Sequence, residues 1–500
     1  MKLYEQYPLS VTNSLSGKKE KFETITPGFV GMYVCGPTVY NFVHLGNTRT
    51  FLTFDIISRY LRFLGYKVRY VRNITDVGHL ENDADEGEDK IGKKARLEQL
   101  EPMEVVKRYT EDFHGVMRQF NILPPSIEPS ATGHIVEQIL ITQKLIEQGL
   151  AYEVNGSVYF DVKKYNKRNH YGILSGRNID ELLESGRDLD SQDEKREKID
   201  FALWKKASPE HIMRWPSPWG DGFPGWHIEC TVMSTKYLGE TFDIHGGGMD
   251  LKFPHHECEI AQAQGANGKT PVQYWIHSNM LTVNGQKMSK SLGNSFLPSE
   301  LFTGNHPMLE KGFSPMTVRF FMLQSHYSST LDFSNEALIA AEKGYKKLAT
   351  ALKHIKAMRH PGHESADAIN QTLDNLVAEC YQNMSDDFNT AKTLAVLFEM
   401  SARINDMHSG NLPMASIDGA VFMRFQAAYQ GFMEDALGLR EEAGHDDQLL
   451  DGTIKVLIEL RKKARVDKQY ALSDKIRDDL KGIGIQLKDG KDGSISYSID

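Results

Sequence analysis

One segment near the amino terminus constrains the fold more than any other: residues 31–47, with the sequence GMYVCGPTVYNFVHLGN. Its first residues suit a buried strand, Gly36 and Pro37 signal a turn, and apolar residues recur at helical spacing over residues 48–64. A second strand is predicted over residues 67–74. A strand, a helix and a strand within this length form a βαβ unit, so we predict an α/β fold with a parallel sheet.

The same segment carries two chemically useful groups. Cys35 is predicted at the carboxyl end of the first strand, the edge at which open α/β sheets bind ligands. His44 and Asn47 flank the start of the following helix, where main-chain N–H groups bind phosphate well, and Gly46 allows a phosphate to approach closely. A soft metal ligand and a nucleotide-binding corner are therefore predicted within one short segment.

The composition excludes several classes of protein. The chain has 500 residues, a quarter of them charged, and no apolar run approaches the roughly 20 residues needed to span a bilayer. The amino terminus has no apolar core like that of a signal peptide, so we expect a cytoplasmic protein that does not bind membranes. Four cysteines do not make a disulfide framework in so long a chain. A net charge of −9 does not favour nonspecific nucleic-acid binding, although a local basic face is compatible with it.

Further along the chain, the charge and the hydrophobic periodicity change several times. Residues 81–90 are strongly acidic and are interpreted as a surface insertion. Residues 163–225 have weak periodicity and many charges, and we interpret them as an insertion between two halves of the sheet domain. Residues 335–439 have a helical pattern throughout. Residues 449–499 are predicted to form two helices and a terminal hairpin.

Four residues form a candidate zinc site: Cys35, Cys230, His255 and Glu259. His255 and Glu259 are four residues apart on a predicted helix and therefore point to one face. Zinc accepts thiolate, imidazole and carboxylate ligands in a tetrahedron. Spacing alone leaves the ligands open, because Cys258 is also near His255 and is softer than Glu259. The alternative is that these cysteines are small core residues and His255 an ordinary helix histidine.

Three other patterns are ambiguous when taken singly. The glycines after His245 allow a main chain to pass close to a nucleotide, but such triplets are more often turns. Lys287 and Lys290, in the sequence KMSKS, are suited to clamp a triphosphate, whereas two lysines alone usually mark a solvated turn. The two C-terminal helices carry basic residues that suit either an RNA backbone or a solvated face. These residues are Arg461, Lys462, Lys463, Arg465, Lys468, Lys475, Arg477 and Lys481.

Together, these motifs resemble a known family. Residues 44–47 (HLGN) resemble the HIGH motif of class I aminoacyl-tRNA synthetases, and residues 287–291 are identical to their KMSKS motif. The two motifs occur in the family's order on either side of a long insertion. The segments CGPTVY, NITD, GWHIEC, FDIHGGG, FPHHE, DFNT and SDKIRDDL narrow the resemblance to the cysteinyl-tRNA synthetases, over nearly the whole chain.

The resemblance implies a Rossmann-type parallel-sheet catalytic domain with a connective insertion, followed by a helical bundle and a small C-terminal anticodon-binding domain. We expect the first half of the catalytic domain and the start of the insertion over residues 1–162, and the connective insertion over residues 163–225. The second half, with the KMSKS loop and stem-contact region, is expected over residues 226–334. The bundle is expected over residues 335–440 and the anticodon-binding domain over residues 447–500. A monomer is the family expectation.

The implied activity is cysteine–tRNA ligation. Cysteine is activated with ATP, which binds with Mg²⁺, and is then transferred to the 3′ end of cysteine-specific tRNA. One zinc ion per chain selects the thiol, and the family's ligands map onto Cys35, Cys230, His255 and Glu259, which favours Glu259 over Cys258. The resemblance assigns three further groups of residues: catalytic His44, Asn47, Lys287 and Lys290; ATP-binding His44, Asn47, Gly246, Gly247, Gly248 and Lys290; and Thr75 and Trp226 in the cysteine pocket.

Two features depart from the family pattern. Asn47 replaces the second histidine of HIGH, and it is able to donate a hydrogen bond to phosphate but is never cationic. The acidic residues 81–90 interrupt a segment that is usually continuous in the family, and their role is not implied by the resemblance.

Two other functions fit part of the sequence. Relatives of this fold ligate cysteine to an amino-sugar in thiol biosynthesis, but they lack the full anticodon-binding end that residues 449–500 resemble. A noncatalytic zinc- and RNA-binding relative should have lost His44 or the pair Lys287 and Lys290, and this chain retains all three.

Overall fold

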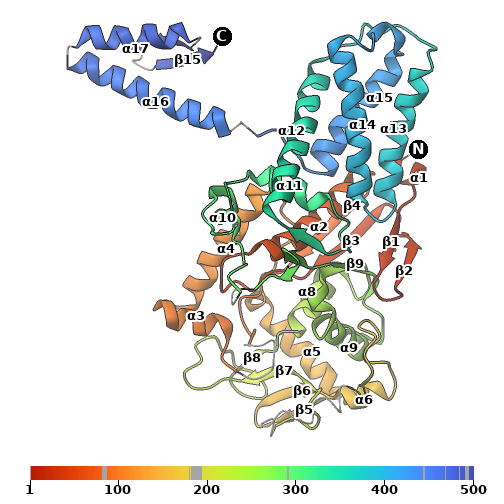
Figure 1. The fold of residues 1–500 in the computed structure, drawn as a ribbon. Helices are drawn as coiled ribbons and strands as arrows, with labels where there is room; N and C mark the ends of the chain where they lie inside the picture. Colours follow the sequence, from red (N-terminus) through yellow and green to blue (C-terminus); the bar gives the residue numbers. More distant parts are fainter. Residues whose placement is uncertain are drawn as a thin grey trace. The chain divides into compact units, whose positions relative to one another are not determined.

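The computed structural model forms two compact units, Met1–Arg440 and Glu441–Asp500, which are described separately (Figure 1). The described residues are 2–80, 87–179, 181, 194–289, 292–442, 445–467, 469–483, 485–489 and 495–499. Most of the acidic stretch 81–90 therefore lies outside the described residues, as do Lys290 and Lys468.

The centre of the first unit is a four-stranded parallel sheet with the order β10-β9-β3-β4. Its strands are β3 (Phe29–Val34), β4 (Lys67–Arg72), β9 (Phe242–Gly248) and β10 (Val272–Ser278). From β3 the chain passes first to β4 on one side and later to β9 on the other. A topological switch point therefore lies between the carboxyl ends of β3 and β9, where ligands bind in such sheets. The predicted parallel α/β fold is confirmed.

Alternate residues of β3 enter different cores. Met32 and Val34 belong to the larger core, which also contains the apolar face of α2 (Leu45–Phe63). Tyr33 and Cys35 belong to a separate core with Cys230 and Met233 of α8 (Ile228–Leu238). This division follows from strand geometry, because successive side chains point to opposite faces of a sheet. Cys35 consequently faces the α8 side.

The insertion has an antiparallel sheet of its own, β5-β6-β7-β8. The strands are β5 (Ala151–Val154), β6 (Ser157–Phe160), β7 (Phe201–Lys206) and β8 (Gly222–Pro224). Asn155 and Gly156 have φ values of 52° and 87°, as a two-residue hairpin turn requires. Helices α3 (Lys90–Glu98), α4 (Pro102–Gln119), α5 (Ile135–Glu147) and α6 (Val162–Asn166) precede or accompany these strands.

After β8, the chain returns to the main sheet through α8, β9 and α9 (His255–Asn267), and then forms a smaller sheet of order β12-β11-β13. These strands are β11 (Leu281–Val283), β12 (Gln286–Lys287) and β13 (Leu331–Phe333). Between β12 and β13 lie α10 (Pro298–Thr303) and α11 (Pro315–Leu323). At the amino terminus, α1 (Leu3–Gln6) leads to the hairpin of β1 (Ser10–Asn13) and β2 (Lys18–Lys21).

Helices dominate the last part of the first unit, as the periodicity predicts (Figure 1). They are α12 (Asn335–Ala357), α13 (Ile369–Ser385), α14 (Thr390–Ser409), α15 (Gly419–Gln430) and the π-helical turn η6 (Gly431–Ala436). Their buried stripes share one continuous core with α2, so the bundle and the sheet domain are not separated by solvent.

The second unit contains α16 (His445–Val466), α17 (Tyr470–Gly482) and a hairpin of β14 (Ile485–Asp489) and β15 (Ile495–Ile499). Ile454, Ile458, Leu480 and Ile485 form its small core. Arg461 is fully buried, so the prediction that it belongs to an exposed basic face, open to an RNA backbone or to solvent, is wrong for this residue. The reason is helical spacing, because Arg461 follows Ile454 and Ile458 along the same buried face.

Among the helices that the described residues form, none combines the length and apolarity that crossing a bilayer requires.

Candidate active site and metal centre

Cys35 is held at the sheet edge by a turn that only glycine permits. It follows β3 directly, and the next residue, Gly36, donates its N–H to the side-chain oxygen of Asn73 at 2.8 Å. A Cβ at position 36 would lie 1.6 Å from the main-chain oxygen of Asn73. The chain therefore turns sharply here and leaves the Cys35 thiol at the switch point of the sheet.

The other three predicted zinc ligands lie close to that thiol. Cys230 lies in the first turn of α8, and His255 and Glu259 lie on one face of α9. The Sγ atoms of Cys35 and Cys230 are 3.6 Å apart, and Oε1 of Glu259 is 3.6 Å from Sγ of Cys35. Nε2 of His255 is 3.2 Å from the same oxygen of Glu259. All four residues are buried, and their donor atoms lie within 4.8 Å of one another.

A second donor set overlaps the first: Cys35, His245, His256 and Glu259. His245 Nε2 is 2.8 Å from Oε2 of Glu259, and His256 Nε2 is 3.3 Å from Sγ of Cys35. Sequence reasoning missed both histidines as donors. The sequence shows that His255 and His256 are adjacent, but consecutive helix residues point about 100° apart. The sequence around them therefore does not reveal that both side chains reach the same thiol.

Burial governs the ionisation of this cluster. It raises the pKa of the Cys35 thiol well above its ordinary range and that of Cys230 to about 12, and it lowers the pKa of the nearby His277 to about 3. The protein groups alone thus favour neutral thiols, and a bound cation is what stabilises buried thiolates. Two thiols, an imidazole and a carboxylate form a donor set whose chemistry fits zinc.

Cys258 belongs to neither set. Its Sγ lies 3.5 Å from the hydroxyl of Tyr171, and it packs in the core between α9 and the insertion. The softer ligand that spacing alone left open therefore faces away from Cys35.

A cleft of about 510 Å³ adjoins the cluster and contains residues from several predicted motifs. Its lining includes Cys35 and His255 from the metal cluster, and His44, Asn47 and Ser289 from the two nucleotide motifs. One cavity thus brings the candidate metal ligands and the candidate phosphate ligands together.

His44 is the N-cap of α2. Its Nδ1 accepts the main-chain N–H of Asn47 at 3.3 Å, so a neutral ring carries its proton on Nε2. That N–H is a hydrogen-bond donor suited to an anion at the helix start. The side chain of Asn47 is exposed at the cleft.

The KMSKS segment lies against this corner. Lys287 ends β12, after a hairpin turn in which Asn284 and Gly285 have φ values of 49° and 75°. A Cβ at Gly46 would lie 3.0 Å from Cε of Met288, so the two motifs are in close contact. Lys290, the other predicted lysine, lies outside the described residues.

Asn294 fixes the loop internally. It accepts the N–H of Ser289 at 2.8 Å and donates to the carbonyl of Lys287 at 3.2 Å. Sequence reasoning did not single out Asn294, because a lone asparagine after a basic loop carries no distinctive pattern.

The three predicted glycines end β9, and they differ in their surroundings. A Cβ at Gly246 would lie 2.0 Å from the ring of Phe54, and one at Gly247 would lie 2.8 Å from His256. Gly246 and Gly247 thus permit close packing, whereas Gly248 lines the cleft.

The two predicted cysteine-pocket residues are placed differently. Trp226 lines the cleft, with its ring 4.0 Å from that of His79 and 4.4 Å from that of His255 between centroids. Thr75 is buried and donates its hydroxyl to Oε1 of Glu229 at 2.5 Å. Thr75 is absent from the described lining of the cleft, but it pairs with Thr38, which belongs to that lining.

Comparison with known families agrees with this geometry. The family model described as "tRNA synthetases class I (C) catalytic domain" matches residues 21–343, and a DALR domain model matches residues 379–440. The fold and the two adjacent motifs are thus those of a class I aminoacyl-tRNA synthetase. A cysteine–tRNA ligase of Bacteroides thetaiotaomicron is 55% identical over 491 residues, which cover 98% of each chain. The chain belongs to the cysteine–tRNA ligase family of that class.

Other relatives agree. A cysteine–tRNA ligase of Porphyromonas gingivalis is 54% identical over 98% of this chain and 99% of its own. Among solved structures, Mycobacterium tuberculosis methionyl-tRNA synthetase in complex with methionyl-adenylate shares the fold, with a TM-score of 0.55 and 14% identity. That match covers 82% of this chain and 89% of the other.

Proposed function

We propose that this chain activates cysteine with ATP, forming cysteinyl-adenylate and pyrophosphate, and then transfers cysteine to the 3′ end of cysteine-specific tRNA. The observation that carries the proposal is the cleft that joins a buried thiol, imidazole and carboxylate cluster to the HLGN and KMSKS motifs. The first group suits the side chain of cysteine, and the second suits the phosphates of ATP.

In the first step, a carboxylate oxygen of cysteine attacks the α-phosphorus of ATP. The bond from that phosphorus to the oxygen bridging to the β-phosphate breaks, and pyrophosphate leaves with Mg²⁺. His44 donates from Nε2 and Asn47 from its amide to the phosphates, while Lys287 and Lys290 balance the charge that grows on the leaving group. The chemistry is mostly positioning and electrostatic stabilisation. The adenosine lies near Gly246, Gly247 and Gly248.

On the cysteine side, Cys35, Cys230, His255 and Glu259 would hold one zinc ion per chain. A zinc ion there supplies a soft Lewis acid that favours a thiol over the hydroxyl of serine. Trp226 and Thr75 belong to the amino-acid pocket: Trp226 lines the cleft directly, and Thr75 pairs with Thr38, which also lines it. A single methylene or isosteric difference is worth only roughly 1–3 kcal/mol in an apolar pocket, so a metal ligand provides the stronger discrimination.

The remaining proposals concern the whole chain. The catalytic domain extends over residues 1–162 and 226–334 around a connective insertion at residues 163–225, and a bundle follows over residues 335–440. Residues 447–500 read unstacked anticodon bases. The protein acts as a monomer in the cytoplasm.

The test is cysteine-dependent exchange of radioactive pyrophosphate into ATP, with serine as the competing substrate and zinc content measured on the same sample. We expect exchange with cysteine and at most a trace with serine. Metal-replete protein that shows no exchange with cysteine contradicts the proposal. Charging of cysteine-specific tRNA then distinguishes a tRNA ligase from an enzyme that uses an amino-sugar acceptor.

A further inference from the structure

Arg49 is a buried arginine whose acceptors lie on two other segments of the chain. Only 2% of the residue is exposed. Its guanidinium donates to the carbonyl of Met280 at 2.5 Å, to that of Ser329 at 2.5 Å and to that of His326 at 3.4 Å. Because these acceptors are main-chain carbonyl oxygens, the guanidinium connects α2 to the main chain at Met280, His326 and Ser329.

Both short contacts are at the beginning of a strand. Met280 directly precedes β11, and Ser329 lies two residues before β13, the parallel neighbour of β11. Strand β11 then turns back into β12, which ends at Lys287. Arg49 therefore fixes the base of the hairpin that carries the KMSKS loop.

The other end of the loop is also attached to α2. The N–H of Leu45 donates to the carbonyl of Phe296 at 3.0 Å, and Gly46 lies against Met288. The KMSKS loop is thus attached to α2 at two places. The first turn of α2 binds the C-terminal end of the loop, and Arg49 binds the base of the hairpin. The hydroxyl of Ser278 also donates to that of Thr50 at 3.0 Å, so loss of the guanidinium should weaken the attachment at the base of the hairpin and allow a shift along α2 without abolishing the contact.

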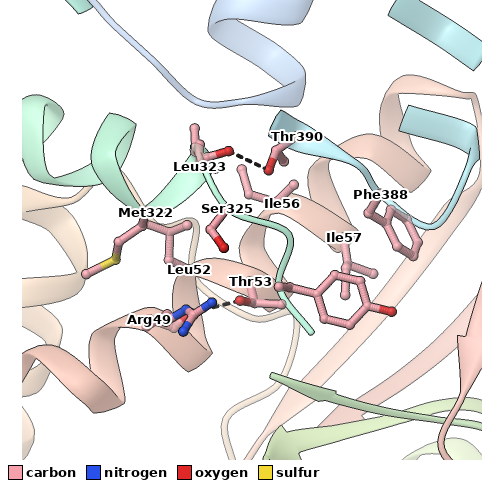
Figure 2. A pocket seen from close by; sticks show the side chains of 11 residues that line it. Arg49, Leu52, Thr53, Ile56, Ile57, Met322, Leu323, Ser325, Phe388 and Thr390 are labelled. Atoms are coloured by element: carbon pink, nitrogen blue, oxygen red, sulfur yellow. Dashed lines mark hydrogen bonds between the residues drawn. The ribbon is translucent and has the colours of Figure 1, made fainter. Parts of the chain in front are cut away.

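The surroundings of Arg49 argue against a direct role in binding. The cavity beside its side chain, between α2 and α11, has a volume of only about 20 Å³, enough for one water molecule (Figure 2). Figure 2 shows Arg49 with Leu52, Thr53 and Met322 around this cavity, and the Thr53 hydroxyl donates to the Arg49 carbonyl at 2.9 Å. Arg49 is not part of the described lining of the 510 Å³ cleft.

From these contacts we infer that Arg49 is a positioning residue, which sets the separation between the helix start carrying His44 and Asn47 and the hairpin carrying Lys287. The inference rests on the proposed function, because that separation must match the length of a bound triphosphate. A displacement of about 1 Å in such a site costs up to about 100-fold in rate. Loss of the guanidinium should therefore slow adenylate formation without changing how cysteine is bound.

The same helix offers a matched control. Arg59 is also largely buried, with 8% exposed, and it donates to Asp55 at 2.8 Å and to the carbonyl of Asn121 at 2.6 Å. It ties α2 to the segment after α4 rather than to the hairpin. A substitution of Arg59 should thus destabilise the fold comparably while leaving the geometry of the phosphate site intact.

The test measures single-turnover formation of cysteinyl-adenylate in the full-length, zinc-loaded protein, with rates normalised to the fraction of active sites. We expect Arg49→Gln to lower the rate constant by about 10- to 100-fold. The KM for cysteine and the zinc content should stay within twofold of the wild type, and Arg59→Gln should keep a rate within threefold of it. If Arg49→Gln does not fold, Arg49→Lys retains the charge but lacks the planar fork, and it should still lower the rate at least fivefold.

Two results would overturn the role of Arg49: a wild-type rate per active site in the substituted protein, or an equal loss in Arg59→Gln. Both presuppose that the wild-type protein forms the adenylate. A wild-type protein that forms none contradicts the proposed function itself, so the two failures are distinguishable.

Discussion

Two donor sets compete at the residue scale, because both contain Cys35 and Glu259. The proposed set adds Cys230 and His255, and the other adds His245 and His256. A second thiolate binds zinc better than a second imidazole when both are buried, which favours the set with Cys230.

We therefore predict that Cys230→Ser and His255→Ala lose bound zinc, whereas His256→Ala and Cys258→Ser retain about one zinc per chain. Cys258→Ser is the matched control for Cys230→Ser, since both thiols are buried and only one belongs to the cluster. Zinc per chain is measured by mass spectrometry after dialysis against a weak chelator. Retention in His255→Ala together with loss in His256→Ala would assign the metal to the other set.

Asp200 offers a pH-dependent prediction away from the metal. Burial raises the pKa of its carboxyl from 3.8 to about 6, although it accepts hydrogen bonds from the Tyr152 hydroxyl at 2.7 Å and the Val162 N–H at 2.9 Å. The folded chain holds this proton more tightly than the unfolded chain. The resulting stability is present below about pH 4 and is lost as the pH rises through about 6.

Replacing the carboxyl by an amide removes that titration. The free energy of unfolding of Asp200→Asn, minus that of the wild type, should rise by about 3 kcal/mol as the pH is raised from acidic to mildly alkaline. The size follows because each unit of pKa shift corresponds to about 1.4 kcal/mol. Melting temperatures of the two proteins, measured across that range, provide the check. A difference between them that does not change with pH contradicts the prediction.

Sequence reasoning found the residues that belong to motifs and missed those that act through three-dimensional contacts. Cys35, His44 and Lys287 lie in recognisable segments, and the structure places all three close to one cleft. Arg49 and Asn294 have no local signature, because their partners are main-chain carbonyls and amides far along the chain or across a loop. Only the packed structure reveals such partners.

At the scale of elements, one turn connects the bundle to the rest of the first unit. Between α13 and α14, Asp387 and Phe388 have φ values of 63° and 54°, a conformation that non-glycine residues rarely adopt. The Asp387 carboxylate accepts the N–H of Thr12 at 2.8 Å, its hydroxyl at 2.5 Å and the hydroxyl of Tyr327 at 2.7 Å. These bonds join β1, the segment after α11 and the bundle.

Removing this carboxylate should be costly, because the buried Tyr327 hydroxyl and the part-buried N–H and hydroxyl of Thr12 would lose this acceptor. We predict that Asp387→Ala destabilises the first unit by about 3 kcal/mol. The neighbouring Asp386 forms an exposed ion pair with Lys19 at 2.5 Å, and Asp386→Ala should cost no more than about 1 kcal/mol. Thermal unfolding followed by circular dichroism compares the two. Equal melting temperatures for the two variants would mean that the turn is not a structural junction.

Elements with strong periodicity were predictable, and elements held by distant partners were not. Regular apolar spacing predicts a helix over residues 48–64, and α2 is observed over Leu45–Phe63. Strands β7 and β8 fell in a region of weak periodicity. They form because β7 pairs with β6, more than 40 residues earlier in the chain, through contacts such as Val158 opposite Trp204.

At the scale of the whole molecule, the boundary after Arg440 divides the chain into a unit that contains the cleft and the metal cluster and a second, smaller unit. The described cleft and the metal cluster consist entirely of residues from the first unit, which has its own continuous core. The second unit has a separate small core around Ile454, Ile458 and Leu480. Neither core needs the other for its packing, so the first unit should fold and retain its chemistry without residues 441–500.

This division predicts different effects on the two half-reactions. A chain that ends at Arg440 should retain cysteine-dependent pyrophosphate exchange within about threefold of the full-length rate, because the cleft is complete. It should lose at least about tenfold in kcat/KM for charging cysteine-specific tRNA, since a loss of about 1.4 kcal/mol in tRNA binding already has that effect. Both assays are run on the same preparations with equal zinc content. Parallel loss of exchange and charging would show that the second unit supports the catalytic cleft itself, whereas full retention of charging would remove residues 447–500 from tRNA recognition.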